Sequence, residues 1–169
     1  MTAVKESTVL RPDLLDLGGK RVLVTGAGQG VGREIALTVA AHGASVVVND
    51  YNRGRAEQVA NEVATVGGTA FVAACDVTEF DDVQRMVAET GPIDILVNNA
   101  GNAGPENDPL NPAPPFWETD PSDWHSWLDT NLYGVMTCTR AALPGMVERR
   151  WGRVITIVSD AGRVGEPLA

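Results

Sequence analysis

The sequence has few of the residues that build disulfide frameworks or metal centres. Its 169 residues include two cysteines and two histidines. Cys75 and Cys138 stand among small or apolar neighbours, which favours reduced thiols in a core over a disulfide. His42 and His125 stand apart, without the spacing of metal ligands. We therefore predict no metal site.

Long apolar runs and an excess of positive charge are also absent. No uninterrupted apolar stretch approaches the ~20 residues of a membrane span, and residues 1–10 lack the apolar stretch of a signal peptide. The 13 basic residues are outnumbered by 22 acidic ones, which gives a formal net charge of −9. This balance argues against binding to nucleic acid or to an anionic membrane. We expect a cytoplasmic protein with one domain.

Short β-branched or apolar runs alternate with segments of helical periodicity. The predicted strands, each continuous enough to be buried on both faces, are Arg21–Thr25, Ser45–Asn49, Ala70–Ala74, Ile93–Asn98 and Arg153–Val158. The first predicted helix, Val31–His42, carries an apolar stripe of Val31, Ile35 and Val39, and the second carries Ala56, Val59, Ala60 and Val63.

Two further helices are predicted from their start signals. Thr78 is expected to cap a third helix, which turns Val83, Met86 and Val87 to the core. A longer helix is expected to open with Asp120 as its cap and to run toward residue 149. The proline-rich residues 102–120 before it are predicted to form a loop.

This alternation predicts an α/β fold, in which a doubly wound, Rossmann-like parallel sheet has helices on both faces. We expect the domain to occupy residues 21–169, behind an extension of residues 1–20. Ligands of such folds bind at the carboxyl ends of the strands.

Four alternate glycines join the first strand to the first helix: Gly26, Gly28, Gly30 and Gly32. The absence of side chains lets the backbone turn sharply, and it lets phosphate oxygens approach the N–H groups that open the helix. A turn before a helix also favours glycine for purely structural reasons. The position of this cluster, between a strand and a helix, favours a dinucleotide site.

Asp50 follows the second strand, 18 residues after Gly32. A carboxylate there can accept hydrogen bonds from the adenosine ribose and would repel a 2′-phosphate, which favours NAD over NADP. Gln29 in the glycine turn is uncharged. Arg53 keeps NADP open as an alternative, and Asp50 could also be a solvated turn carboxylate.

The spacing Thr25-Gly26-x-x-x-Gly30-x-Gly32 resembles the signature of the short-chain dehydrogenase/reductase family. Four further matches follow in the family's order. They are Asp76-Val77 after the third strand, Asn98-Asn99-Ala100-Gly101 after the fourth, Asn131 in Asn-Leu-Tyr-Gly-Val, and Ser159 after the fifth. The two asparagines after the fourth strand, and Asn131 on its helix, could also have purely structural roles.

The resemblance implies an NAD-dependent oxidoreductase that interconverts a secondary alcohol and a ketone, with a hydroxyacyl-CoA, alicyclic or steroid-like substrate. Ser159 would polarise the substrate oxygen, and Asn131 would take part in a proton relay. The implied cofactor-binding residues are Gly26, Gln29, Gly30, Val31, Gly32, Asp50, Asp76, Val77, Asn98 and Gly101. Relatives are usually tetramers, so a homo-oligomer is expected.

One family motif does not occur in the sequence. The resemblance implies a Tyr-x-x-x-Lys about a dozen residues after Ser159, and the sequence ends at Ala169. Neither Tyr51 nor Tyr133 is followed by lysine four residues later. We expect the sequence to be incomplete at its carboxyl end and the 169-residue chain to be inactive. The alternative is an NAD-binding module without catalysis.

Overall fold

A five-stranded parallel sheet forms the centre of the computed structural model, which describes residues 15–102 and 114–159. The strands are β1 (Arg21–Val24), β2 (Ser45–Asp50), β3 (Thr69–Ala74), β4 (Ile95–Asn98) and β5 (Arg153–Thr156), in the spatial order β3-β2-β1-β4-β5. The predicted doubly wound α/β fold is confirmed.

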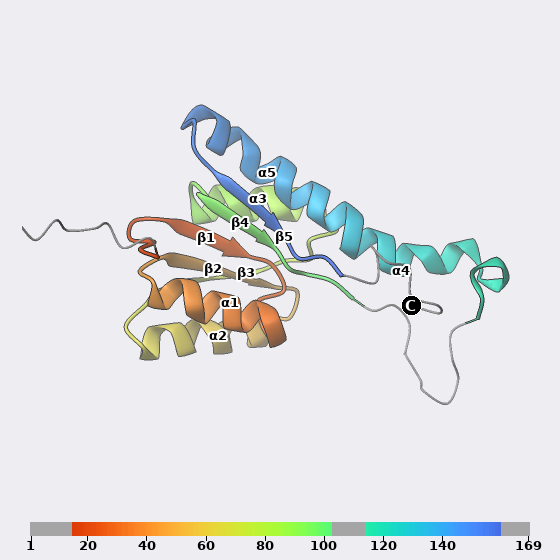
Figure 1. Cartoon of the computed structure of the whole chain (residues 1–169), viewed down its shortest axis with the longest axis horizontal. Helices are drawn as coiled ribbons and strands as arrows, with labels where there is room; N and C mark the ends of the chain where they lie inside the picture. Colours follow the sequence, from red (N-terminus) through yellow and green to blue (C-terminus); the bar gives the residue numbers. More distant parts are fainter. Residues whose placement is uncertain (1–14, 103–113, 160–169) are drawn as a thin grey trace, which may run out of the picture.

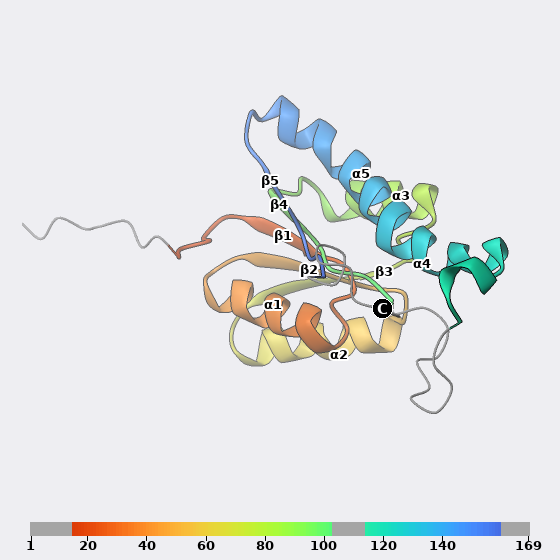
Figure 2. The same ribbon diagram turned by 45° about the vertical axis from the view of Figure 1, so that its right-hand side comes forward.

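Helices cover both faces of this sheet. One face carries α1 (Gly30–Ala41) and α2 (Arg53–Thr65), and the other carries α3 (Phe80–Thr90) and α5 (Gly134–Glu148) (Figure 1, Figure 2). The chain enters α5 through two 3-10 turns (Phe116–Glu118 and Pro121–Trp124), the short α4 (His125–Leu128) and a π-helical turn (Asp129–Tyr133). No helix of the described residues is long and apolar enough to cross a membrane.

The core lies in two layers because successive side chains of a strand point to opposite faces. Val22, Val24, Val46, Val48 and Val97 pack against buried residues of α1 and α2, whereas Leu23, Val47 and Leu96 pack against α3 and α5. The central strands are therefore buried on both faces, as predicted.

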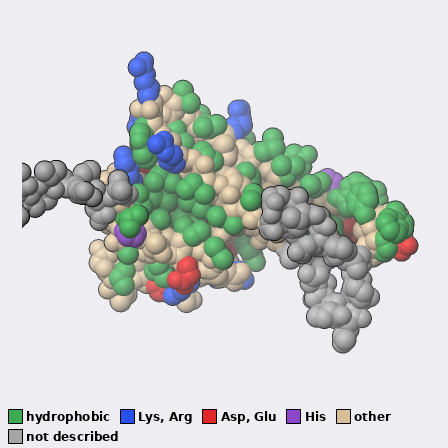
Figure 3. Space-filling model, viewed as in Figure 1, with side chains coloured by type: hydrophobic (Ala, Val, Ile, Leu, Met, Phe, Trp, Pro, Cys, Tyr) green, Lys and Arg blue, Asp and Glu red, His purple; other side chains and the backbone are tan. Residues whose placement is uncertain are grey.

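The prediction of burial on both faces is wrong for β3 and β5. These two strands form the edges of the described sheet, and every residue of β5 is exposed. Val154 and Ile155 are 41% and 48% exposed, and Figure 3 shows hydrophobic side chains gathered on this face of the molecule. An edge strand has a neighbouring strand on one side only. The apolar run therefore predicted that a strand forms, but it did not predict how far its side chains are buried. The strand also ends at Thr156, two residues before the predicted Val158.

The helix predictions need three corrections. The buried stripe of α1 is Gly32, Ala36 and Ala40, whereas Val31 is 64% exposed. Glu79 takes the cap position of α3, because the Thr78 hydroxyl donates to Asp76 Oδ1 instead. The segment from residue 120 to 149 is not one regular α-helix, although the Asp120 carboxylate does cap its start by accepting from the Ser122 N–H.

The side chains predicted for the second and third helices do face the core. Val59 and Val63 of α2 are fully buried, as is Val83 of α3, and Met86 is 5% exposed. In the extension before β1, Leu17 packs against the first core layer and its N–H donates to His42 O. Most of the predicted loop lies outside the described residues.

Candidate cofactor site

The strand register brings the predicted site residues to one edge of the sheet. Val24 of β1 pairs with Val48 of β2 and with Val97 of β4, so the residues after these positions emerge together. The chain leaves β1 toward β2 on one side and reaches β4 on the other, and a crevice forms where the strand order reverses in this way. A cleft of about 500 Å³ opens there.

Predicted and unpredicted residues share this cleft. The predicted ones are Gly26, Gln29, Gly30, Val31, Gly32, Asp50, Asp76, Val77 and Gly101. They are joined by Asn49, Tyr51, Arg55, Cys75, Asn99, Ala100, Asn102 and Thr130.

The glycines of the turn have different roles. A Cβ at Gly26 would lie 2.8 Å from Ala100 Cα, and one at Gly32 would overlap Gly26 O, so both glycines allow close packing of backbone. Gly30 has a φ of +55°, and a Cβ there would meet no atom within 4 Å. Gly30 is therefore glycine for its left-handed backbone, and its open side is free for a ligand.

The amino end of α1 is available for an anion. Gln29 occupies the cap position without a side-chain hydrogen bond to the helix, and the first turn holds no acidic residue. The first N–H groups of a helix lack partners within it and carry partial positive charge, which suits phosphate oxygens. This end of α1 fits the pyrophosphate of a dinucleotide.

Thr25 and Asn99 hold the glycine turn against the end of β4. The Thr25 hydroxyl accepts hydrogen bonds from the N–H groups of Asn99 and Ala100, both at 3.0 Å. The Asn99 amide donates in return to Thr25 O at 2.9 Å and to Gly26 O at 3.2 Å. These reciprocal bonds preorganise the turn, and Thr25 is 1% exposed.

The Asp50 carboxylate is fixed in the wall of the cleft, and Asp50 is only 3% exposed. Its Oδ2 accepts from the Gly28 N–H at 3.1 Å and its Oδ1 from the Asn52 N–H at 2.9 Å. A Cβ at Gly28 would lie 2.5 Å from Oδ2, so the missing side chain lets the turn reach the carboxylate. Asp50 is thus tied to the same turn that cradles the anion site.

Asp76 and Val77 follow β3, the strand beside β2, and also line the cleft. Asp76 Oδ1 accepts from both the N–H and the hydroxyl of Thr78, at 2.9 Å each. Val77 is buried, and its carbonyl accepts from the Thr137 hydroxyl of α5. These bonds set the position of the wall.

Both cysteines are free thiols, as predicted. Burial raises the pKa of the Cys75 thiol to about 11, with further contributions from Asp82 and Asp76. Burial likewise raises the pKa of Cys138 to about 12. The protonated thiol is therefore the stable form of each near neutral pH, and neither cysteine is a reactive nucleophile.

Asn98 and Asn131 act on the chain around β4. Asn98 is 3% exposed and does not line the cleft; its amide donates to the Thr139 hydroxyl at 3.2 Å, which ties β4 to α5. The Asn131 side chain, in the π-helical turn, bonds both ways to the backbone of Asn102, at 2.9 and 3.0 Å. A Cβ at Gly101 would stand 3.1 Å from Asn131 Oδ1. Asn131 therefore fixes the course of the chain as it leaves β4.

Ser159 follows β5 at the same edge of the sheet. Ile157 N–H donates to Asn98 O at 2.9 Å, so the chain continues beside β4 past the end of β5. Ser159 is exposed. Its role in chemistry stays a prediction.

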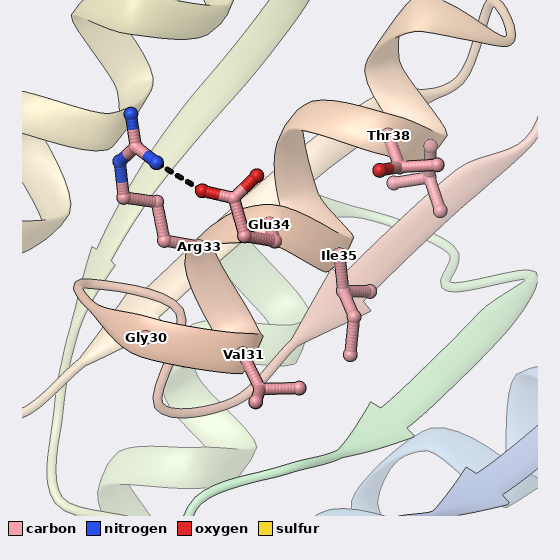
Figure 4. Close-up of a pocket in the computed structure, with 7 residues that line it drawn as sticks. Gly30, Val31, Arg33, Glu34, Ile35 and Thr38 are labelled. Carbon is pink, nitrogen blue, oxygen red and sulfur yellow. Dashed lines mark hydrogen bonds and ion pairs between the residues drawn. The ribbon is translucent and has the colours of Figure 1, made fainter.

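A second hollow, of about 620 Å³, lies along one side of α1 (Figure 4). Val31 and Ile35 line it, and Arg33 and Glu34 form an ion pair beside them. Its lining comes from one helix and is mainly apolar. The cleft at the strand ends gathers convergent polar groups and backbone N–H groups, so we assign the site there.

Eight cleft residues were not predicted to bind the cofactor, and three of them, Tyr51, Arg55 and Asn99, show why. Tyr51 and Arg55 flank Asp50 along the chain, but the turn from β2 into α2 that brings them to the cleft has no glycine signal. Asn99 belongs to the same motif as Asn98, but successive side chains of a strand point to opposite faces. Asn98 therefore bonds to Thr139 of α5, and Asn99 bonds to the glycine turn. Within the described residues, no cluster of histidine, cysteine or acidic side chains could hold a metal ion.

Known proteins share this arrangement. The family model for short chain dehydrogenase matches residues 20–169. The 7alpha-hydroxysteroid dehydrogenase of Escherichia coli is 37% identical over 153 residues, which cover 88% of this chain and 56% of that protein.

Solved structures agree with the sequence comparison. A 3-oxoacyl-[acyl-carrier protein] reductase from Brucella melitensis with bound NAD has a TM-score of 0.85 at 33% identity, covering 100% of this chain and 63% of that one. A gluconate 5-dehydrogenase from Burkholderia cenocepacia in complex with NADP and tartrate has a TM-score of 0.80 at 35% identity, covering 91% and 59%. The chain thus spans less than two thirds of these relatives. The family model, which matches nearly the whole chain, identifies it as a member of the short-chain dehydrogenase family.

Proposed function

We propose that the protein is an NAD-dependent oxidoreductase that interconverts a secondary alcohol and a ketone. The observation that carries this proposal is the cleft itself, where the uncapped end of α1, the open side of Gly30 and the tethered Asp50 carboxylate meet. A pyrophosphate would lie on the N–H groups of α1, and the ribose hydroxyls of the adenosine would donate to Asp50. Both NAD and NADP occur among the related structures, so the choice of NAD rests on Asp50.

A bound nicotinamide ring supplies hydride transfer when it is present. The chain's own residues hold and orient the reactants. The Ser159 hydroxyl donates a hydrogen bond to the substrate oxygen. Asn131 keeps the chain after β4 in place through its hydrogen bonds to the backbone of Asn102. From this position Asn131 takes part in the proton relay.

The resemblance and the relatives support a proposal for the substrate class. A steroid dehydrogenase, an acyl-carrier-protein reductase and a gluconate dehydrogenase are all similar to this chain. We propose a hydroxyacyl thioester, an alicyclic alcohol or a steroid-like alcohol as the substrate, in the cytoplasm. The protein assembles as a homotetramer through α5, whose Met136 and Val147 are 56% and 70% exposed.

Two experiments test the proposal. Calorimetric titration of the chain with NAD should give saturable binding, and the complete protein should reduce NAD with at least one alcohol of these classes. An absence of NAD binding would refute the proposal, because the cleft would then not be a cofactor site.

The second candidate function is a non-catalytic NAD-binding module, which needs only the cleft at the ends of the strands. Turnover by the complete protein decides between the two. Binding of NAD without turnover on any alcohol or ketone of the panel would favour the module.

A further inference from the structure

Asn102, which follows β4, binds the helical segment that leads into α5 with both its side chain and its backbone. Its side-chain amide donates to Ser126 O at 2.6 Å and to the Thr130 hydroxyl at 3.3 Å. Its backbone N–H donates to Asn131 Oδ1 at 2.9 Å, and its carbonyl accepts from the Asn131 amide at 3.0 Å. One residue is thus bonded to three residues of α4 and the π-helical turn.

The partners of Asn102 lie at different angles around the helix axis. Ser126 and Thr130 are four residues apart, so they are neighbours on one face of the helix. In a regular α-helix Asn131 would point about 100° away from Thr130. The turn that contains Thr130 and Asn131 is π-helical instead, with hydrogen bonds that span five residues. This wider turn reduces the angle between successive side chains, and Asn102 bonds to both sides of it.

The same contacts set the place of Asn131 beside the cofactor cleft. The helical segment extends past the carboxyl ends of the strands (Figure 1). Among the described residues, Asn102 and Thr130 line the cleft, whereas Asn131 adjoins Thr130 without lining it. The Asn131 side chain is held through the backbone of Asn102, and Asn102 is held in turn through Ser126 and Thr130. Asn102 and Asn131 are exposed, so water competes for each single bond and the connected set matters more than any one of them.

We infer that the Asn102 side chain is a positioning residue for the proposed reaction, because it holds the π-helical turn in the form that places Asn131 beside the cleft. Its amide donors fix two points of the helix, Ser126 O and the Thr130 hydroxyl. The backbone of the same residue then fixes Asn131. This inference rests on the proposed function, in which Asn131 takes part in a proton relay.

The first test follows the side-chain amide signals of Asn131 in a proton–nitrogen correlation spectrum of the chain. Asn102→Asp keeps the shape of the side chain, but an ionised carboxylate cannot donate to Ser126 O. Asn102→Leu removes the donors and the polarity together. Both variants should shift the Asn131 signals and speed the exchange of their protons with water by about fivefold, the effect of losing a typical hydrogen bond. Asn61→Leu, in α2 and away from the cleft lining, is the matched control and should leave these signals in place.

The second test measures turnover of the complete protein with NAD and an alcohol that the unsubstituted protein oxidises. Asn102→Leu and Asn102→Asp should lower kcat by about fivefold or more and change NAD affinity by less than about twofold. A merely structural role would lower NAD affinity and the melting temperature together with kcat. Asn61→Leu should change neither kcat nor NAD affinity.

The outcomes separate this inference from the proposed function. Unshifted Asn131 signals in both variants would overturn the inference, because Asn131 would then be held without the Asn102 side chain. Unchanged kcat, an equal loss of kcat and NAD affinity, or a failure of both variants to fold would overturn it as well, while the proposed function stands. If the unsubstituted protein binds NAD but oxidises no alcohol and reduces no ketone, the proposed function fails, and this inference fails with it.

Discussion

Substitution of Gly30 by valine separates the binding role of the glycine turn from its role in the fold. A Cβ at Gly30 would meet no atom within 4 Å, so the added side chain has room in the folded protein. That room is the part of the cleft where we place the pyrophosphate. Gly30→Val should therefore weaken cofactor binding strongly without preventing folding.

The cost in stability comes from the backbone. Gly30 has a φ of +55°, where a residue with a Cβ loses about 1–2 kcal/mol. For a domain of this size, that loss lowers the melting temperature by roughly 2–8 °C. The loss in binding should be larger, because one or two hydrogen bonds from N–H groups to a charged pyrophosphate are removed, which corresponds to about 100-fold in affinity.

Gly67 provides a matched control. It has a φ of +82° in the turn between α2 and β3, and a Cβ there would also meet no atom within 4 Å. Gly67→Val should thus lower the melting temperature by a similar amount and leave the cofactor cleft intact. Thermal denaturation measures the first effect, and calorimetric titration with NAD measures the second.

Two results would refute this reasoning. Normal NAD binding by a folded Gly30→Val variant would mean that the turn is only structural. An equal loss of binding in Gly67→Val would mean that general destabilisation, rather than occupation of the cleft, is the cause.

Four further predictions concern single side chains. Asp50→Ala should narrow the difference between NAD and NADP affinity, because the carboxylate that repels a 2′-phosphate is gone; an unchanged ratio in titrations would contradict this. In the complete protein, Ser159→Ala should lower turnover by about 100-fold, the effect of removing one positioned donor, with NAD affinity unaltered; a loss of affinity instead would refute its assignment to substrate. Thr25→Val should lower the free energy of unfolding by roughly 2 kcal/mol in urea denaturation, because the N–H groups of Asn99 and Ala100 lose their acceptor. Cys75, with its pKa raised to about 11, should resist alkylation by iodoacetamide at about pH 8 and react as the pH approaches that value; rapid alkylation at neutral pH would contradict its burial.

Much of the fold could be predicted because parallel strands and their helices have strong periodic signals. The runs that contain Val22–Val24 and Val46–Val48 are apolar throughout since both faces are covered, and the glycine turn marks the link to α1. Side-chain periodicity on α1 was less informative. Alanine and glycine form its fully buried stripe. Of the predicted stripe, Ile35 and Val39 pack partly buried against the core and Val31 is exposed, so hydrophobicity alone located only the edge of the buried face.

Site residues could be predicted where a short sequence motif fixes the backbone. They could not be predicted where the chain turns without such a motif. Gly30 and Asp50 are tied to elements whose ends the sequence marks. Arg55 reaches the cleft through packing on Gly28 and stacking on Tyr51, and contacts of this kind depend on the register between β2 and the glycine turn. The sequence alone therefore did not show that Arg55, and not Arg53, lines the cleft.

A titration of the isotopically labelled chain with NAD, followed by the amide signals in a proton–nitrogen correlation spectrum, tests the central claim most directly. The amides of Gly30, Val31 and Gly32 should shift together and saturably, since their N–H groups face the proposed pyrophosphate. The amide of Gly67 should stay in place. Absent shifts, or shifts confined to residues away from the end of α1, would contradict the assignment of this cleft as the dinucleotide site.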